Sequence, residues 1–164
     1  MLQETIHYGL LVGLAIALLV AAVTDLRQRK IHNWLNLAIA LAAPAYWWAS
    51  GLSLWPGVAI QLGVALLAFA VLAGLFALRT MGGGDVKLLT ALALWIRWEA
   101  FIELLFVMAI AGGVLTVVMG MWHVARRNTH KLSIPYGVAI AIGGLWVIGP
   151  QIVPAASTMA ANLQ

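Results

Sequence analysis

The two aspartates of this 164-residue chain, Asp25 and Asp85, are the side chains best suited to chemistry. They lie in the polar segments DLRQRKIHN and MGGGDVKLL, each beside a long apolar stretch. Two carboxylates that share one proton can hydrolyse a peptide bond. The ionised carboxylate takes a proton from water while the protonated one polarises the scissile carbonyl. The pair therefore points to the chemistry of an aspartic protease.

Few other residues compete for this role. The remaining acids, Glu4, Glu99 and Glu103, are expected on the opposite face of the membrane described below. The chain has no cysteine, which excludes a thiolate nucleophile and Cys-ligated zinc. His123 and His130 lie in or beside a basic loop without a nearby carboxylate, so we expect no metal site there. No cofactor is expected either.

The composition predicts how these residues are positioned. Hydrophobic residues make up 64% of the chain and charged residues only 9%, against about 25% charged in soluble domains. We therefore expect an all-α, polytopic membrane bundle of about six transmembrane helices, forming one domain over residues 1–164. The shortest apolar run, Val86–Ile96, is the weakest of these spans. The other expected spans are Ile6–Val23, Trp34–Ser50, Gly57–Leu78, Phe101–Trp122 and Ile134–Pro154.

The cations predict the orientation of the bundle. If six helices alternate in direction, all cations except Arg97 fall on one side, which the positive-inside rule makes cytoplasmic. Both aspartates then lie at the cytoplasmic face, and both termini lie outside. The net charge of +4 indicates contact with anionic lipid rather than nucleic acid. The cations on the cytoplasmic side are Arg27, Arg29, Lys30, Arg79, Lys87, Arg126, Arg127 and Lys131.

The three glycines before Asp85 exceed what a simple helix start needs. Gly82, Gly83 and Gly84 can adopt positive φ and let another chain approach closely. We expect them to admit an extended substrate segment that hydrogen-bonds to the backbone. Asp85 is expected near the N-terminus of a helix, whose dipole favours its ionised form. Asp25 follows a helix C-terminus, where the dipole disfavours the charge, so Asp85 is expected to be the ionised partner. Arg27, Arg29 and Lys30 oppose this ranking by stabilising ionised Asp25, but we expect their effect to be partly screened.

At this point the sequence resembles a known family. GGGDVKL is similar to the GxGD signature of membrane aspartic proteases, and GxGDxKL to that of type IV prepilin peptidases. The resemblance implies that Asp85 pairs with an aspartate in a D-x-x-x-x-x-I-x-N segment. That segment corresponds here to Asp25, Ile31 and Asn33. The chain departs from the family at His32, where proline is common.

A further match lies before the last helix, where Pro135-Tyr136-Gly137 resembles the family's P-[FY]-G motif. The resemblance implies that Asp25 and Asp85 are catalytic and that the residues of the other motif positions bind substrate. These expected substrate-binding residues are Gly82, Gly83, Gly84, Lys87, Pro135, Tyr136 and Gly137.

The absence of cysteines and the short length resemble the compact prepilin peptidases of Flp pili, called TadV or CpaA. Larger members carry an added region with paired CxxC motifs and also methylate the new N-terminus. The resemblance implies cleavage of prepilin and minor-pilin leaders after a glycine, at the cytoplasmic face of the bacterial inner membrane. An archaeal preflagellin peptidase, which shares both motifs, remains an alternative.

A non-enzymatic transporter or assembly subunit with structural aspartates is the alternative from another class. Against a transport route, Gln61 and Thr116 are the only evident polar groups within the expected spans. The tryptophans near helix ends are expected to form an aromatic belt at the lipid headgroups. They are Trp47, Trp48, Trp55, Trp95, Trp98 and Trp122.

Overall fold

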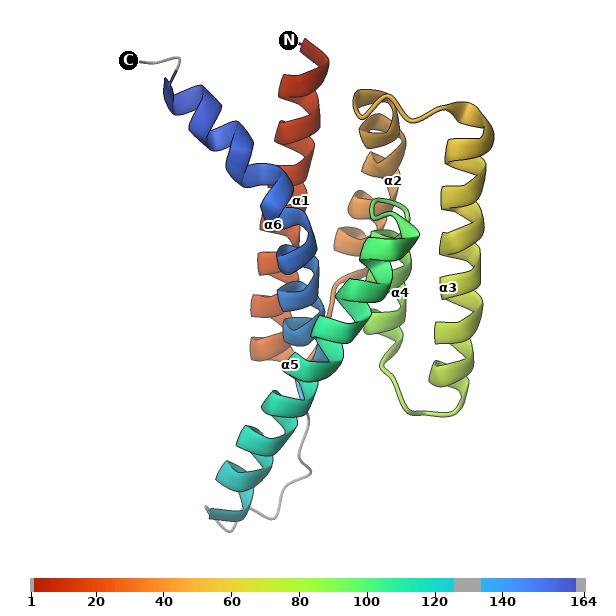
Figure 1. Cartoon of the computed structure of the whole chain (residues 1–164). Coiled ribbons are helices and arrows are strands. Elements are labelled where there is room, and N and C mark those ends of the chain that lie inside the picture. The colour runs from red at the N-terminus through yellow and green to blue at the C-terminus, as the bar shows by residue number, and fades with distance from the viewer. Residues whose placement is uncertain (1, 126–133, 162–164) are drawn as a thin grey trace.

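The computed structural model describes residues 2–125 and 134–161, and this part of the chain folds into six α-helices with no strand (Figure 1). A short turn of π-helix, η1 (Leu54–Val58), precedes the third of them. The helices are α1 (Leu2–Gln28), α2 (Asn33–Ala49), α3 (Ala59–Ala77), α4 (Gly83–Ala93), α5 (Trp98–Ala125) and α6 (Tyr136–Ala161). The all-helical membrane fold expected from the sequence is confirmed.

Four stretches of the described chain are long and apolar enough to cross a membrane: α1, η1 with α3, α5, and α6 up to Val153. Helix α2 has 17 residues. Helix α4 has only 11 residues, so it is about 16 Å long and cannot cross a hydrocarbon core of about 30 Å. The apolar run after Asp85 therefore encodes a short interior helix rather than a sixth full span. Its buried residues are Val86, Leu88, Leu89, Ala91, Leu92 and Ala93.

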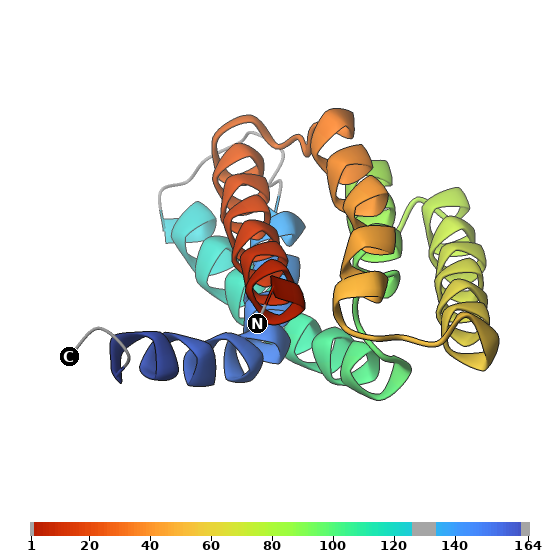
Figure 2. The same ribbon diagram turned by 90° about the horizontal axis from the view of Figure 1, so that it is seen from above.

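Seen from above, the helices form two groups of three (Figure 2). In one group α6 packs against both α1 and α5, and in the other α4 packs against both α2 and α3. The two groups meet where α1 contacts α2 and where α4 contacts α6. The two sequence segments that carry the aspartates belong to different groups.

Small residues let α6 pack closely in its group. A Cβ at Gly143 would lie 2.7 Å from the Leu104 carbonyl oxygen of α5, and one at Gly144 would lie 2.7 Å from the Leu18 side chain of α1. A larger residue at either position would therefore push the helices apart. This packing places the N-terminus of α6 beside the C-terminal end of α1.

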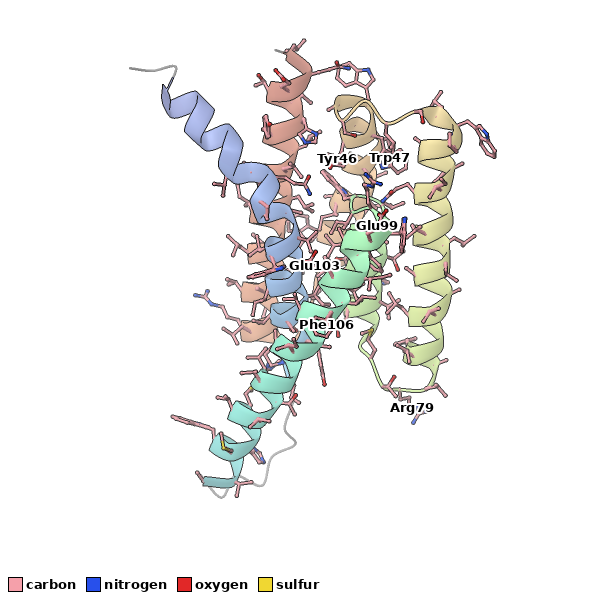
Figure 3. The ribbon with its side chains drawn as sticks, in the orientation of Figure 1. Tyr46, Trp47, Arg79, Glu99, Glu103 and Phe106 are labelled. Atoms are coloured by element: carbon pink, nitrogen blue, oxygen red, sulfur yellow. The ribbon has the colours of Figure 1, made fainter. Side chains whose placement is uncertain are left out.

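One end of the bundle carries most of the described cations. Helices α1 and α3 end there, and α2 and α4 begin there (Figure 1). Arg79 lies at this end, whereas Glu99, which pairs with Arg97 at 3.4 Å, lies toward the other (Figure 3). The distribution matches the expected charge asymmetry. Arg126, Arg127, His130 and Lys131 lie outside the described residues.

Candidate active site

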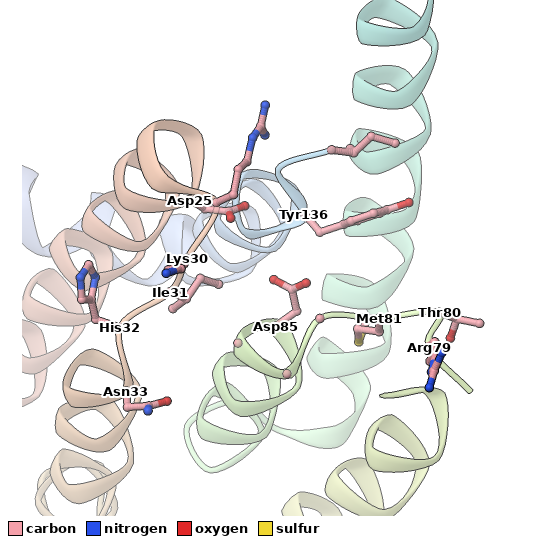
Figure 4. A pocket seen from close by; sticks show the side chains of 15 residues that line it. Asp25, Lys30, Ile31, His32, Asn33, Arg79, Thr80, Met81, Asp85 and Tyr136 are labelled. Carbon is pink, nitrogen blue, oxygen red and sulfur yellow. The ribbon is translucent and has the colours of Figure 1, made fainter. Parts of the chain in front are cut away.

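Asp25 and Asp85 line one open pocket of about 830 Å³ at the cation-rich end. Their carboxylates point toward each other across it (Figure 4). Asp25 comes from the last turns of α1 and Asp85 from the first turn of α4, so the pocket lies where the two helix groups meet. The other lining residues are Arg29, Lys30, Ile31, His32, Asn33, Arg79, Thr80, Met81, Gly82, Gly83, Gly84, Ile134 and Tyr136.

Asp25 is buried and is held by the N-terminus of α6. The backbone N–H of Gly137 donates a hydrogen bond of 2.7 Å to Asp25 Oδ2. Because Gly137 is the second residue of α6, both this N–H and the helix dipole stabilise negative charge on Asp25. A Cβ at Gly137 would lie 2.9 Å from both Cβ and Oδ2 of Asp25. The glycine of the P-Y-G motif thus allows the contact that favours ionised Asp25.

Asp85 is in an environment that lets it keep its proton to a higher pH than an ordinary aspartate does. Burial, followed by the negative charge of Asp25, raises the pKa of Asp85 to about 6. A hydrogen bond from the backbone of Gly82 acts in the opposite direction. Gly82 is the N-cap of α4 and Asp85 its third residue, so the carboxylate reaches back to the cap as in a capping box.

These contacts reverse the roles expected from the sequence. The helix dipole of α4 alone would favour ionised Asp85, but burial and the neighbouring carboxylate outweigh it. Asp25 lies in the last turn of α1, yet it receives an N–H from a different helix, 112 residues further along the chain. The expected ranking gave most weight to the helix that carries each aspartate and treated the nearby cations as screened, although the Arg29 charge does favour ionised Asp25. Burial disfavours the ionised form of both carboxyls, but Asp25 receives the Gly137 N–H and Asp85 faces the charge of Asp25, so Asp25 is the more readily ionised of the two.

The glycines before Asp85 contact the chain's own atoms. A Cβ would lie 2.8 Å from Asp85 Oδ2 at Gly82, 3.2 Å from the Phe76 ring at Gly83, and 3.3 Å from Ile31 Cβ at Gly84. None of the three has positive φ, so that part of the expectation is wrong. Each glycine instead has a packing reason, and all three also line the pocket.

The two aspartate-bearing motifs interlock through residues beside the carboxylates. Ile31 packs on Gly84, and Lys87 Nζ donates a hydrogen bond of 2.8 Å to Asn33 Oδ1. Asn36, whose role the sequence did not indicate, donates a longer bond of 3.4 Å to the Gly84 carbonyl. These contacts fix the start of α4 against α2 and the segment that precedes it.

The remaining predicted substrate-binding residues lie in different positions relative to the pocket. Tyr136 lines the pocket, whereas Pro135 is buried and the Gly137 N–H donates its hydrogen bond to Asp25. Lys87 is exposed and absent from the pocket lining, so its predicted contact with substrate there is not supported. This agrees with helical geometry, which turns a residue two positions after Asp85 by about 200°.

Two of the cations that the sequence placed at this face, both arginines, lie at the pocket. Arg29 and Arg79 line it, and they are the only non-glycine residues in the described chain with positive φ, 55° and 59°. They follow the C-terminal ends of α1 and α3, where a left-handed residue commonly ends a helix. No three His, Cys, Asp or Glu side chains gather within the described chain to hold a metal ion.

Sequence comparison decides the family. Residues 12–117, which include both aspartates, match the model of the type IV leader peptidase family. The chain belongs to this family. It is 29% identical over 146 residues to a prepilin leader peptidase/N-methyltransferase of Burkholderia pseudomallei, an alignment that covers 80% of this chain and 43% of that protein.

Other members of the type IV leader peptidase family align over a shorter region. A prepilin leader peptidase/N-methyltransferase of Pectobacterium carotovorum is 36% identical over 66 residues, covering 40% of this chain and 23% of that protein. One from Aeromonas hydrophila is 38% identical over 68 residues, covering 41% and 22%. The chain thus spans less than half the length of these relatives. No solved structure matches it.

Proposed function

We propose that this chain is a membrane-embedded aspartic endopeptidase that removes leader peptides from prepilins, with Asp25 and Asp85 as its catalytic pair. One observation carries the proposal: the only two aspartates of the sequence line one pocket, where burial and then the charge of Asp25 raise the pKa of Asp85. Membership of the type IV leader peptidase family supports the substrate class. Perturbed, mutually interacting carboxylates in a pocket are typical of acid–base catalysis.

The contacts of the two carboxylates assign their roles. Ionised Asp25 takes a proton from a water molecule, whose oxygen attacks the carbonyl carbon of the scissile peptide. Protonated Asp85 donates a hydrogen bond to the carbonyl oxygen, which carries the developing negative charge. The tetrahedral intermediate collapses as its C–N bond breaks, and the leaving amine takes the proton that Asp25 had accepted. The products are a carboxylate and a free amine.

We place the pocket at the cytoplasmic face of a bacterial inner membrane, with both termini outside. The support is electrostatic, because the pocket end carries five of the six described cations. These cations are Arg27, Arg29, Lys30, Arg79 and Lys87. The substrates proposed are Flp-type prepilins and minor pilins, cut after a glycine. The methyl transfer named for the longer relatives is not extended to this chain.

Coexpression with a Flp-type prepilin tests the pair directly. Leader removal is read as a shift in gel mobility, and equal membrane levels of each variant are verified by immunoblot. Asp25→Asn and Asp85→Asn should each abolish cleavage, because neither asparagine can exchange the required proton. Glu99→Gln is the matched control, since Glu99 is an exposed acid outside the pocket. Cleavage at an appreciable rate by either aspartate variant would refute the proposal.

A further inference from the structure

Helix α4 ends inside the bundle, and this creates a hydrogen-bonding problem. Its last residues and the turn that follows are buried, including Leu92, Ala93, Trp95 and Ile96. The turn lies below the level at which α2 ends and α3 begins (Figure 1). The last four carbonyls of a helix have no partner within it. Backbone N–H groups of the turn bond to the carbonyls of Ala91 and Leu92. The carbonyls of Ala93, Leu94 and Ile96 need donors from side chains, because an unsatisfied carbonyl away from water is destabilising.

Two side chains from neighbouring helices supply them. Gln61 Nε2, from α3, donates to the carbonyl oxygens of Ala93 at 2.8 Å and Ile96 at 2.7 Å. Trp47 Nε1, from α2, donates to the Leu94 carbonyl oxygen at 2.7 Å. Figure 3 shows Trp47 on the side of the bundle where α4 ends. Together these bonds clamp the C-terminal end of α4.

A third bond ties the same turn to α2, because Trp95 Nε1 donates to the Ile39 carbonyl oxygen at 2.8 Å. Trp95 is therefore an interior residue and its expected placement in a headgroup belt is wrong, whereas Trp47 is half-buried. Trp95 is only 6% exposed. Their N–H groups are used for protein contacts rather than for lipid.

Gln61 is the donor to these carbonyls that comes from an otherwise apolar helix. It is the only polar side chain of α3, a helix that is otherwise apolar from Ala59 to Ala77, and it is 7% exposed. The amide nitrogen carries two hydrogens, and both are directed to carbonyls of the turn after α4. An apolar side chain of equal length would fill the same volume but leave both carbonyls without a donor.

We propose that Gln61 is a positioning residue that sets the place of Asp85 relative to Asp25; this inference rests on the proposed function. Asp85 and Ala93 are eight residues apart on one helix, about 12 Å, so α4 transmits a displacement at one end to the other. The contact between Lys87 and Asn33 at the start of α4 is exposed and forms a weaker anchor. Loss of the buried anchor would let α4 shift along its axis and carry Asp85 away from Asp25.

The test compares Gln61→Met with a matched control, Thr116→Val. Thr116 donates a hydrogen bond of 2.7 Å to the Gly112 carbonyl within α5, so its loss removes a polar group without touching α4. Purified variants are assayed for prepilin cleavage across pH, per folded protein. Gln61→Met should lower kcat about tenfold to a hundredfold with KM little changed, because the reacting groups are misplaced. The alkaline limb of its pH–activity profile should move to lower pH, since a more distant Asp25 raises the pKa of Asp85 less.

A direct measure of position is available because the chain contains no cysteine. Cysteines introduced together at Asn33 and Lys87 report the register of α2 against α4, and a short bismaleimide should couple them. Coupling should be slower in the Gln61→Met background than in the parent or in Thr116→Val. If Gln61→Met does not fold, Gln61→Glu serves instead, since a protonated glutamate keeps one donor. It should show a smaller change in the same direction.

The outcomes separate this inference from the proposed function. If Gln61→Met, or Gln61→Glu in its place, keeps the parent kcat, alkaline limb and coupling rate while Asp85→Asn is inactive, the positioning role is wrong and the proposed function stands. If the aspartate variants still cleave, the proposed function fails, whatever the coupling rate. Lower kcat together with slower coupling and a displaced alkaline limb supports the positioning role.

Discussion

The raised pKa of Asp85 predicts that this residue destabilises the fold at neutral pH. The pKa of Asp85 is about 6 against an ordinary value of 3.8, because burial and the charge of Asp25 disfavour its ionised form. A carboxyl whose pKa is higher in the folded state contributes stability below about pH 4, and this contribution is lost as pH rises to about 6. The full difference corresponds to about 3 kcal/mol. Water in the open pocket reduces it to about 1 to 3 kcal/mol.

Asp85→Asn should therefore stabilise the protein while abolishing its activity. Asparagine is neutral at every pH, and its side-chain oxygen can still accept the hydrogen bond from Gly82. In thermal unfolding of the detergent-solubilised protein, the variant should have a higher Tm at pH 8 by about 3 to 10 °C. The gain should disappear at pH 4, where the parent carboxyl is itself protonated. The exposed Glu99→Gln should change the Tm little at either pH.

Two results would refute this reasoning. An Asp85→Asn protein no more stable than the parent at pH 8 would show that the site does not disfavour the charge. An equal gain at pH 4 and pH 8 would show that the effect comes from packing or hydrogen bonding rather than from ionisation. A Tm gain that disappears between pH 8 and pH 4, as the Asp85 carboxyl of the parent becomes protonated, supports ionisation of Asp85 as the cause.

Two glycine substitutions test the local contacts. Gly137→Ala should break the hydrogen bond to ionised Asp25, because its Cβ would lie 2.9 Å from Asp25 Oδ2. Loss of such a bond, worth about 1.5 to 3 kcal/mol, should move the acidic limb of the pH dependence of kcat/KM up by about 1 to 2 pH units. An unmoved acidic limb would count against the α6 contact. Gly84→Val should abolish most cleavage and lower the Tm, because its Cβ would already lie 3.3 Å from Ile31 Cβ. Gly113→Ala is its control, since nothing lies within 4 Å there, and equal behaviour of the two would contradict the packing role.

The sequence predicted the class of fold and the end of the bundle at which the aspartates lie. Both predictions depend on strong local signals, since long apolar runs give helices and flanking cations give their direction. The depth of α4 was not predictable in this way. Its residues are as apolar as those of a span, and only contacts with other helices show that it ends at Ala93. The role of Gln61 depends on where α4 ends, so it could not be predicted from the sequence either.

The ranking of the carboxylates failed for a related reason. Helix dipoles can be assigned from sequence only for the helix that carries the residue, and for Asp85 that assignment is outweighed by burial. The N–H that stabilises the charge of Asp25 comes from Gly137, 112 residues further along the chain. The P-Y-G motif signalled that the position mattered, but not that its backbone N–H reaches the first aspartate.

The arrangement of the helices explains why the motif residues extend beyond the two acids. Each helix group supplies one aspartate, so the distance between the carboxylates depends on how the groups meet. Ile31 lies in the connection between α1 and α2, directly at that junction, and it packs against Gly84 at the start of α4. A longer side chain at Gly84 would therefore open the junction and separate the pair. By this reasoning Ile31 and Gly84 act as a spacer for Asp25 and Asp85, without touching the substrate's reacting atoms themselves.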